Sequence, residues 1–380
     1  MPPRAHTIVD PRFPAELARL RRERGLSLRQ LAAAVSHGKS VIHQLETGQT
    51  RPAVDVATRL DDALAAGGAL AAMVVDVFDG GRRAAYVAAH SGRVDLAGVR
   101  ILGEVLAGYR RLEDSIGAAA VLPPVRVQLD TIVSLLREAG HQVRPAVVDM
   151  AAQWAQFAGW LGIANGDDRT ARVWLDRSLQ WSTEAGNADL TATVLSFQGH
   201  RAEGRGDLPE MIGLSRAARD DPRANTALRA YSAGQEARGL AMAGACPTEV
   251  RQMLTRAADL ATEAAETPLP AWGYWYTPAF YAVQQGIVWR YLGDRDARAN
   301  DRAIELLTVG TAGVDETAES ADWHGRHLVH LAIAHGRAGD SGSALQVLER
   351  ARSIAVSTAS RRLAGQVDAA VRDLGLSVNP

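Results

Sequence analysis

The stretch GLSLRQLAAAVSHGKSVIHQLETG, residues 25–48, decides the fold of the N-terminal part of this chain. Ser27 and Gln30 have the spacing of a capping box, in which each side chain bonds the backbone N–H of the other residue. This pattern predicts a helix that begins directly after Ser27. A second helix is expected from Lys39 to Gly48, because glycine commonly ends a helix.

The two predicted helices are separated by a short break at residues 36–38. Ala32 and Ala33 leave room for two helices to cross closely, which a helix-turn-helix requires. Helical spacing places Ile42 and Leu45 on the inner side of the second helix. The residues on its outer side are the candidates for reading base edges: Lys39, Ser40, His43 and Gln44.

Charge is unevenly distributed along the chain. The 380 residues carry a net charge of −1. Residues 1–52 hold nine basic and four acidic side chains, so this segment is +5 and the remainder is −6. A basic N-terminal segment on an acidic body indicates an anionic partner for that segment alone.

The segment 25–48 resembles the Cro/repressor (XRE) family of helix-turn-helix domains and aligns without a gap to the pattern of lambdoid phage repressors. The resemblance covers about 55 residues. It implies a lambda-repressor-like domain whose second motif helix lies in the major groove, with Gln44 pairing with adenine and Lys39 with guanine. The residues that it places near phosphates are Ser27, Arg29, Thr47 and Arg51.

Two further positions follow from the same resemblance. Glu46 matches a family glutamate that bridges back to the first helix, here to Arg21. Leu28 stands where the family usually has a glutamine that supports a phosphate contact, so that contact is in doubt.

The remainder of the chain is expected to be helical throughout, without strands. Gly-Asp pairs recur at residues 166–167, 206–207, 293–294 and 339–340. A period of about 40–46 residues indicates an α-solenoid. The units resemble tetratricopeptide (TPR) repeats, with small residues at Ala171 and Ala344, and the resemblance implies a concave face lined by the first helix of each pair.

The predicted fold class is therefore all-α, with a lambda-repressor-like helix-turn-helix domain followed by a TPR-like α-solenoid. We expect the helix-turn-helix domain at 13–67, a helical spacer at 68–144 with a hinge near 80–81, and the repeat domain at 145–376. Five helix pairs fit between about 146 and 360, followed by a closing helix. The apolar segment 70–78 is expected to pack on the first domain.

An aromatic run, AWGYWYTPAFY at residues 271–281, stands out in a chain with 5% aromatic residues. Such side chains suit a ligand pocket or a partner contact, but they could equally be an inter-repeat loop wedged into the core. The candidate ligand-binding residues are Trp272, Tyr274, Trp275, Tyr276, Tyr281 and His327. Trp154, Phe157 and Trp160 have helical spacing and are interpreted as core.

A histidine-rich stretch, DWHGRHLVHLAIAH at 322–335, could bring His324 and His327 to one metal ion. The alternative is a repeat helix whose histidines line the groove, and this alternative is favoured because no cysteine or clear carboxylate partner follows. No nucleophile, dinucleotide or metalloprotease motif is present. We therefore expect no enzymatic activity, no cofactor and no metal.

The composition excludes other classes of protein. The single cysteine, Cys246, excludes a disulfide framework and a cysteine-based zinc site. The N-terminus lacks an apolar signal core, and no stretch approaches about 18 uninterrupted apolar residues. A soluble cytoplasmic protein without a membrane partner is expected.

The sequence thus predicts a transcriptional regulator that binds double-stranded DNA as a homodimer. Its repeat domain is expected to sense a peptide or small-molecule signal, to mediate dimerisation, or both. The alternative is an interaction scaffold in which the helix-turn-helix only tethers or dimerises the chain and recognises no specific operator.

Overall fold

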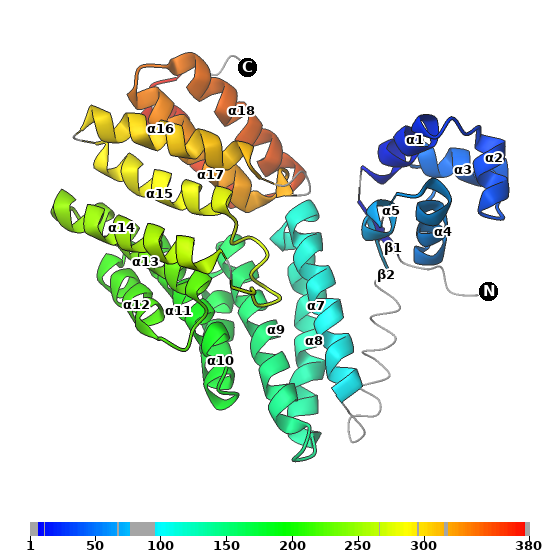
Figure 1. Cartoon of the computed structure of the whole chain (residues 1–380), viewed down its shortest axis with the longest axis horizontal. Helices are drawn as coiled ribbons and strands as arrows, with labels where there is room; N and C mark the ends of the chain where they lie inside the picture. Colours follow the sequence, from blue (N-terminus) through cyan, green and yellow to red (C-terminus); the bar gives the residue numbers. More distant parts are fainter. Residues whose placement is uncertain are drawn as a thin grey trace. The chain divides into compact units, whose positions relative to one another are not determined.

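The computed structural model describes residues 7–10, 12–66, 68–76, 96–265, 267–294, 296–314 and 318–376. Contacts divide the chain into two compact units, Met1–His90 and Ser91–Pro380. Both units are helical, apart from one pair of three-residue strands in the first unit (Figure 1). The prediction of an all-α fold is confirmed.

The first unit is a bundle of short helices. A small antiparallel ribbon joins its two ends, because β1 pairs with β2. Its elements are β1 (Thr7–Val9), α1 (Phe13–Glu23), α2 (Leu28–Ala34), α3 (Lys39–Glu46), α4 (Val54–Leu64), α5 (Ala69–Ala72) and β2 (Val74–Asp76).

The helix-turn-helix forms as the sequence predicts. The Ser27 side chain accepts from the Gln30 N–H, and the Gln30 side chain accepts from the Ser27 N–H at 2.8 Å, so the capping box is complete. The chain turns at Ser36, whose φ of 57° lies in the left-handed region. The N–H of His37 bonds the carbonyl of Ala32 and closes the turn.

One apolar core holds the first unit together. Leu17, Leu31, Ile42 and Leu45 are fully or almost fully buried and come from α1, α2 and α3. Leu70 belongs to the same cluster, as does Val74 in β2. The expected packing of the segment after residue 70 on this domain is therefore confirmed for the residues that the structure describes.

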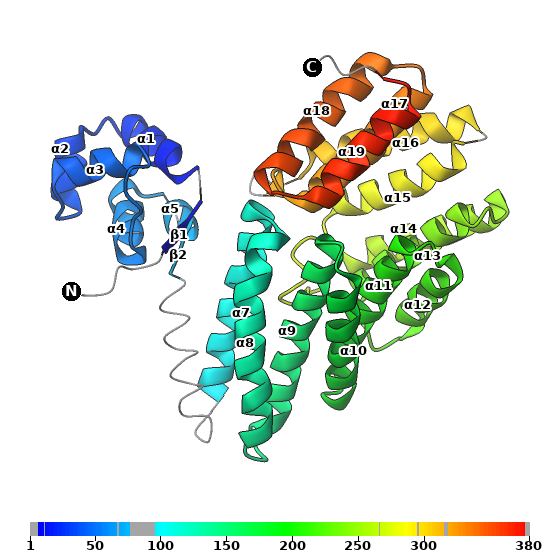
Figure 2. The same ribbon diagram turned by 180° about the vertical axis from the view of Figure 1, so that it is seen from behind.

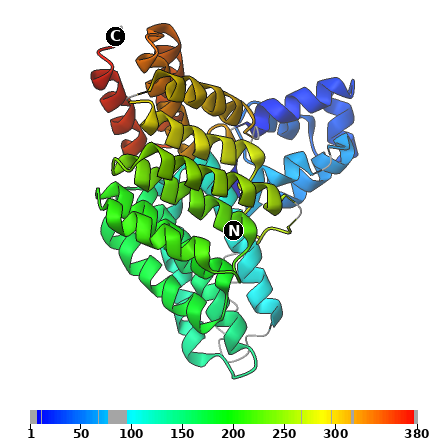
Figure 3. The ribbon, with the colours of Figure 1, turned by 60° about the vertical axis from the view of Figure 1, so that its left-hand side comes forward.

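The second unit is a succession of antiparallel helix pairs, α9/α10 to α17/α18, followed by α19 (Figures 1 and 3). This helical repeat-like arrangement agrees with the expected five pairs and closing helix. Its elements are α7 (Leu96–Ile116), α8 (Ala118–Glu138), α9 (Arg144–Ala164), α10 (Asp168–Glu184), α11 (Ala188–Gly204), α12 (Leu208–Asp220), α13 (Thr226–Met242), α14 (Pro247–Ala264), α15 (Pro278–Leu292), α16 (Ala297–Ala312), α17 (Asp322–Arg337), α18 (Ser341–Ser357) and α19 (Arg361–Asp373).

The recurring Gly-Asp pairs have a structural cause. Gly166, Gly206 and Gly339 end the first helix of a pair with φ between 71° and 81°, a conformation that favours glycine. The aspartate that follows each of them caps the next helix by accepting from a backbone N–H. At these three sites the dipeptide is a compact helix-to-helix turn, whereas Gly293 has a φ of −65° and the residue that caps α16 is Asp296.

The segment 68–144, expected as a spacer, is distributed over both units. Its first part provides α5 and β2, and its later part provides α7 and α8, which pack beside α9. The hinge expected near 80–81 lies outside the described residues. Among the described helices, α8 alone has the length and apolar composition of a membrane span, but it has eight buried side chains, as a core helix does.

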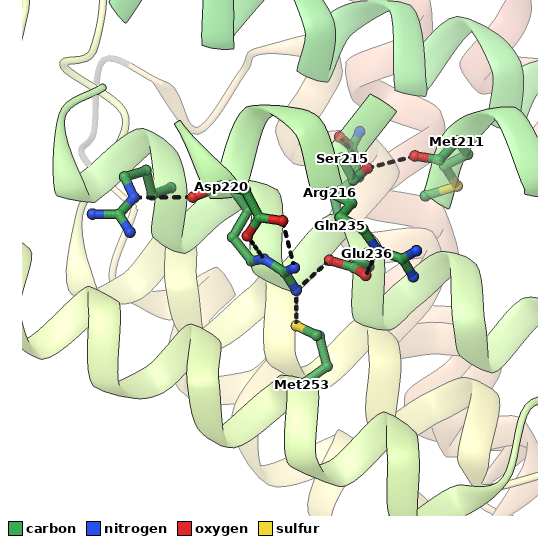
Figure 4. Close-up of polar contacts among 9 residues, drawn as sticks. Met211, Ser215, Arg216, Asp220, Gln235, Glu236 and Met253 are labelled. Carbon is green, nitrogen blue, oxygen red and sulfur yellow. Dashed lines mark hydrogen bonds and ion pairs between the residues drawn. The ribbon is translucent and has the colours of Figure 1, made fainter. Parts of the chain in front are cut away.

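Buried polar contacts also fix neighbouring helices of the array. Glu236 of α13 is 1% exposed and accepts from Arg216 and Arg219 of α12, at 3.0 and 2.6 Å (Figure 4). Ser215 donates to the Gln235 side chain beside them. A buried carboxylate with two guanidinium partners holds the α12–α13 pair in one register.

The array curls until its two ends meet (Figure 2). Asp114 of α7 accepts from the indole of Trp323 in α17, 209 residues later in the chain, at 2.9 Å. Arg362 of α19 donates to the carbonyl of Ile163 in α9 at 2.8 Å. At the same end, the turn at Gly117 lies directly against Thr358. The inner face of the array consequently surrounds a partly open recess.

Candidate nucleic-acid interface and interior cavity

The outer face of α3 presents the four predicted base-reading residues together. Lys39, Ser40, His43 and Gln44 are exposed, whereas Ile42 and Leu45 on the opposite side are buried. The Gln44 amide oxygen accepts from the Thr50 hydroxyl at 3.4 Å. This contact steadies the amide and leaves its N–H₂ free to donate.

The predicted phosphate-binding residues flank this face. Arg29 and Arg51 are exposed. The Ser27 oxygen accepts within the capping box, so its O–H remains free to donate. Thr47 instead donates to the carbonyl of His43 at 2.9 Å and has to rotate before it can donate to a phosphate.

Arg21 and Glu46 form the ion pair that the family resemblance implies. The guanidinium donates to both carboxylate oxygens, at 2.5 and 2.9 Å, and also to the carbonyl of Leu26. The two side chains are only 14% and 8% exposed. This pair fixes α3 against α1 and so orients the exposed face of α3.

The second unit holds a partly open cavity of about 290 Å³. Alternate helices, α7 to α17, supply most of its lining. Aromatic contacts run from Trp160 through Phe197, His200, Tyr231, Phe280 and His327 to Trp323, with ring centres 5.5–6.2 Å apart. Glu113 and Asp114 accept from the indoles at the two ends and complete a closed ring.

The aromatic run 271–281 is divided between this cavity and the core. Tyr274 and Trp275 line the cavity, and the Tyr274 hydroxyl donates to Asp114 at 2.8 Å. Trp272 is buried and donates to Thr193 of α11 at 3.1 Å. Tyr276 is buried among other rings, and the Tyr281 hydroxyl donates to the carbonyl of Ala227. The pocket interpretation therefore applies to Tyr274 and Trp275, and the core interpretation applies to Trp272, Tyr276 and Tyr281.

The histidine-rich helix is α17. His327 and His330 line the cavity, whereas His324 is completely buried outside the lining. Burial lowers the pKa values of all three, so they are neutral at pH 7. Within the described ranges, no group of three or more candidate metal ligands comes together.

Glu113 and Asp114 are two adjacent carboxyl groups in the buried last turn of α7. Burial, reinforced by the negative charge of Asp114, raises the pKa of Glu113 to about 8. Burial also raises the pKa of Asp114, to about 6, against the hydrogen bonds from Trp323 and Tyr274 that favour its charged form. At neutral pH the pair therefore carries about one negative charge.

We expect Glu113→Gln to become more stabilising as the pH rises. The folded-state pKa of Glu113 lies above the ordinary value of 4.5, so its contribution to stability is lost as the pH rises towards 8. The amide has no such loss and can still accept from Trp160. Between pH 5 and 9 the difference in unfolding free energy between variant and wild type should grow by roughly 2–4 kcal/mol.

Denaturant unfolding at several pH values measures this difference. The buried histidines have an opposing effect on stability, but this effect is the same in variant and wild type and therefore cancels. Glu104→Gln on the same helix is the matched control, since that side chain is 63% exposed. A difference that stays constant with pH would show that Glu113 is ionised in the folded protein.

Four arginines contribute positive charge to the cavity. Arg238 pairs with Glu203 at 3.0 Å, and Arg326 pairs with Asp322 at 3.3 Å and lies over the Trp160 ring. For Glu203, burial acts to raise the pKa, but Arg238 and His200 lower it to about 2. Burial lowers the pKa values of Arg110 and Arg362 to about 10, so both remain charged at neutral pH.

Sequence reasoning missed most of this lining. Arg110, Glu113 and Asp114 lie in the segment YRRLEDSIG, where alternating charges are typical of an exposed helix face. Trp160, interpreted as core, lines the cavity, while Trp154 is completely buried. The only available signal was the recurrence of aromatic residues on the first helix of successive pairs.

The comparisons with known proteins bear on the first unit. A family model described as a helix-turn-helix domain matches residues 12–73, the region from the start of α1 to the end of α5. No curated protein matches the chain. Among solved structures, BtubC (BKLC) from P. vanneervenii matches at a TM-score of 0.37 and 17% identity, covering 68% of this chain and 93% of that one. That likeness is too distant to support an argument.

Proposed function

We propose that the chain is a sequence-specific transcriptional regulator of the XRE type that binds double-stranded DNA as a homodimer. The observation that carries the proposal is the exposed face of α3, where Lys39, Ser40, His43 and Gln44 project from a matched helix-turn-helix domain. In a two-fold dimer the half-sites would lie about 34 Å apart along the DNA.

The second unit is proposed to sense the signal. Its cavity is lined by alternate helices of the array, so a ligand would contact many helices at once. A ligand that prefers one arrangement of these helices shifts the population towards that arrangement. We propose a binding role in the cytoplasm, without catalysis and without a cofactor.

DNA binding is tested with the region upstream of the protein's own gene. Binding to this DNA and to a scrambled duplex is compared at two salt concentrations. Selective binding with a steep salt dependence is the expected result, because phosphate contacts release counterions and base contacts discriminate. Weak, unselective binding with little salt dependence would instead support a scaffold whose helix-turn-helix only tethers the chain.

Gln44→Ala is expected to weaken binding to the operator by about 1–3 kcal/mol and to relax base choice at one position. The side chain is exposed and its amide N–H₂ is free to donate. Arg51→Ala is the comparison, because loss of a phosphate contact weakens binding to all sequences and flattens the salt dependence. Equal losses on operator and scrambled DNA would contradict base reading by Gln44.

A further inference from the structure

Arg110 forms no ion pair with any described residue of the second unit. Its side chain is 4% exposed, one terminal nitrogen (Nη2) is buried without a hydrogen-bond partner, and no acid forms an ion pair with it among the described residues. Arg110 lines the cavity, beside the Phe157 ring. A buried charge without a partner is costly, so its retention points to a partner that binds there.

The charges around the cavity leave an excess of about one positive charge at neutral pH. Arg238 and Arg326 are matched by Glu203 and Asp322. The remaining cations are Arg110 and Arg362, and Asp114 is the remaining anion. Asp114 is already held by two neutral donors, Tyr274 and Trp323. One further negative charge would neutralise the site.

Uncharged polar groups in the lining also lack partners. The Gln156 amide oxygen is buried without a donor, and Gln156 is 2% exposed. The buried Nδ1 atoms of His327 and His330 have no hydrogen-bond partner either. A ligand with hydrogen-bonding groups besides its charge would satisfy them.

The volume and the walls limit the rest of the ligand. A cavity of about 290 Å³ is at the small end of ligand pockets, which span roughly 300–1,000 Å³. Trp275, Phe280 and Trp323 present ring surfaces to it. A flat, compact organic body fits such walls.

We propose that this cavity binds a small aromatic organic anion, with its carboxylate or similar group held by Arg110 and its ring packed between the aromatic side chains. The planar guanidinium fork matches the geometry of such an anion. Binding of the anion is argued from the cavity alone. Only the further claim that this anion is the signal for the DNA-binding unit rests on the proposed function.

The test uses the full chain and three probes that differ mainly in charge: 2-naphthoate, the neutral 2-naphthamide and the cationic 2-naphthylmethylammonium. Isothermal titration calorimetry measures their affinities. We expect naphthoate to bind at least about tenfold more tightly than the amide, because a charge-assisted pair replaces a neutral hydrogen bond. We expect the cation to bind most weakly.

Arg110→Met is expected to bring the naphthoate-to-naphthamide affinity ratio close to one without weakening the amide. It should also raise the unfolding temperature by about 2–4 °C, because an uncompensated buried charge is removed. Arg111→Met is the matched control on the next residue, which is exposed, and should change neither property. If the methionine variant does not fold, the same affinity ratio is measured on Arg110→Lys, which keeps the charge.

Three results would overturn the proposal: equal affinities for naphthoate and naphthamide, tighter binding of the cation, or a ratio that survives Arg110→Met. The same preparation is assayed for operator binding. Selective DNA binding without a preference for the anion refutes this inference alone. A preference for the anion without selective DNA binding refutes the proposed regulator function but supports the proposed anion site.

Discussion

Replacing Gly117 by valine is expected to force apart the two ends of the curled array. Gly117 has φ +83°, a conformation that favours glycine, at the turn between α7 and α8. A Cβ atom there would lie 2.4 Å from the Thr358 carbonyl oxygen. Backbone strain and the clash with backbone together should lower the unfolding free energy by about 3–5 kcal/mol.

The consequence extends beyond stability, because Gly117 directly follows the turn that carries Glu113 and Asp114. Displacement of this turn breaks the contacts to Trp160 and Trp323 that complete the cavity ring. Denaturant unfolding measures the stability, and tryptophan fluorescence in native conditions reports the displaced indoles. We expect the ring to open even where the helices themselves remain folded.

Gly186→Val separates the two causes. Gly186 also has a positive φ, of 67°, but a Cβ atom there meets nothing within 4 Å. This variant should incur only the backbone strain, about 1–2 kcal/mol. If Gly117→Val is no more destabilising than Gly186→Val, the contact between the two ends of the array is not tight.

Glu46→Ala is expected to destabilise the first unit by about 2–4 kcal/mol, because it leaves a largely buried guanidinium without its carboxylate. The Arg21–Glu46 pair is bidentate and spans α1 and α3. A domain of this size has a small core and little stability to lose. DNA binding should therefore disappear at elevated temperature and recover on cooling, as expected for loss of folding.

Circular dichroism and operator binding between 15 and 45 °C measure this effect. Glu16→Ala is the matched control, because it removes a partner of the exposed Arg19, which keeps its ion pair with Glu23, and it should cost less than about 1 kcal/mol. Replacing both residues, Arg21→Met with Glu46→Leu, should restore much of the stability. Equal melting of the Glu46 and Glu16 variants would show that the buried pair contributes no more than a surface pair.

Predictability from sequence differs between the two units. In the first unit, local rules sufficed: Ser27 and Gln30 made the predicted capping box, and helical spacing separated buried Ile42 from exposed Gln44. In the second unit, three of the four Gly-Asp pairs marked turns between paired helices, because a left-handed glycine and a capping aspartate act within one turn. The side chains of the aromatic run could not be sorted, since residues adjacent in sequence reached different helices.

The sequence by itself determined the helix pairs, the helix-turn-helix and the identity of its exposed face, because caps, turns and helical periodicity are interactions over a few residues. It did not predict the ribbon of β1 and β2, which pairs segments more than 60 residues apart. Only the tertiary structure decided where the cavity lies. Asp114 meets Trp323 across 209 positions, and that contact depends on the small rotation accumulated over successive helix pairs. No local sequence pattern shows how large this accumulated rotation is. For the same reason, no local pattern marks the charged residues Arg110, Glu113 and Asp114 as the buried residues that they are in the fold.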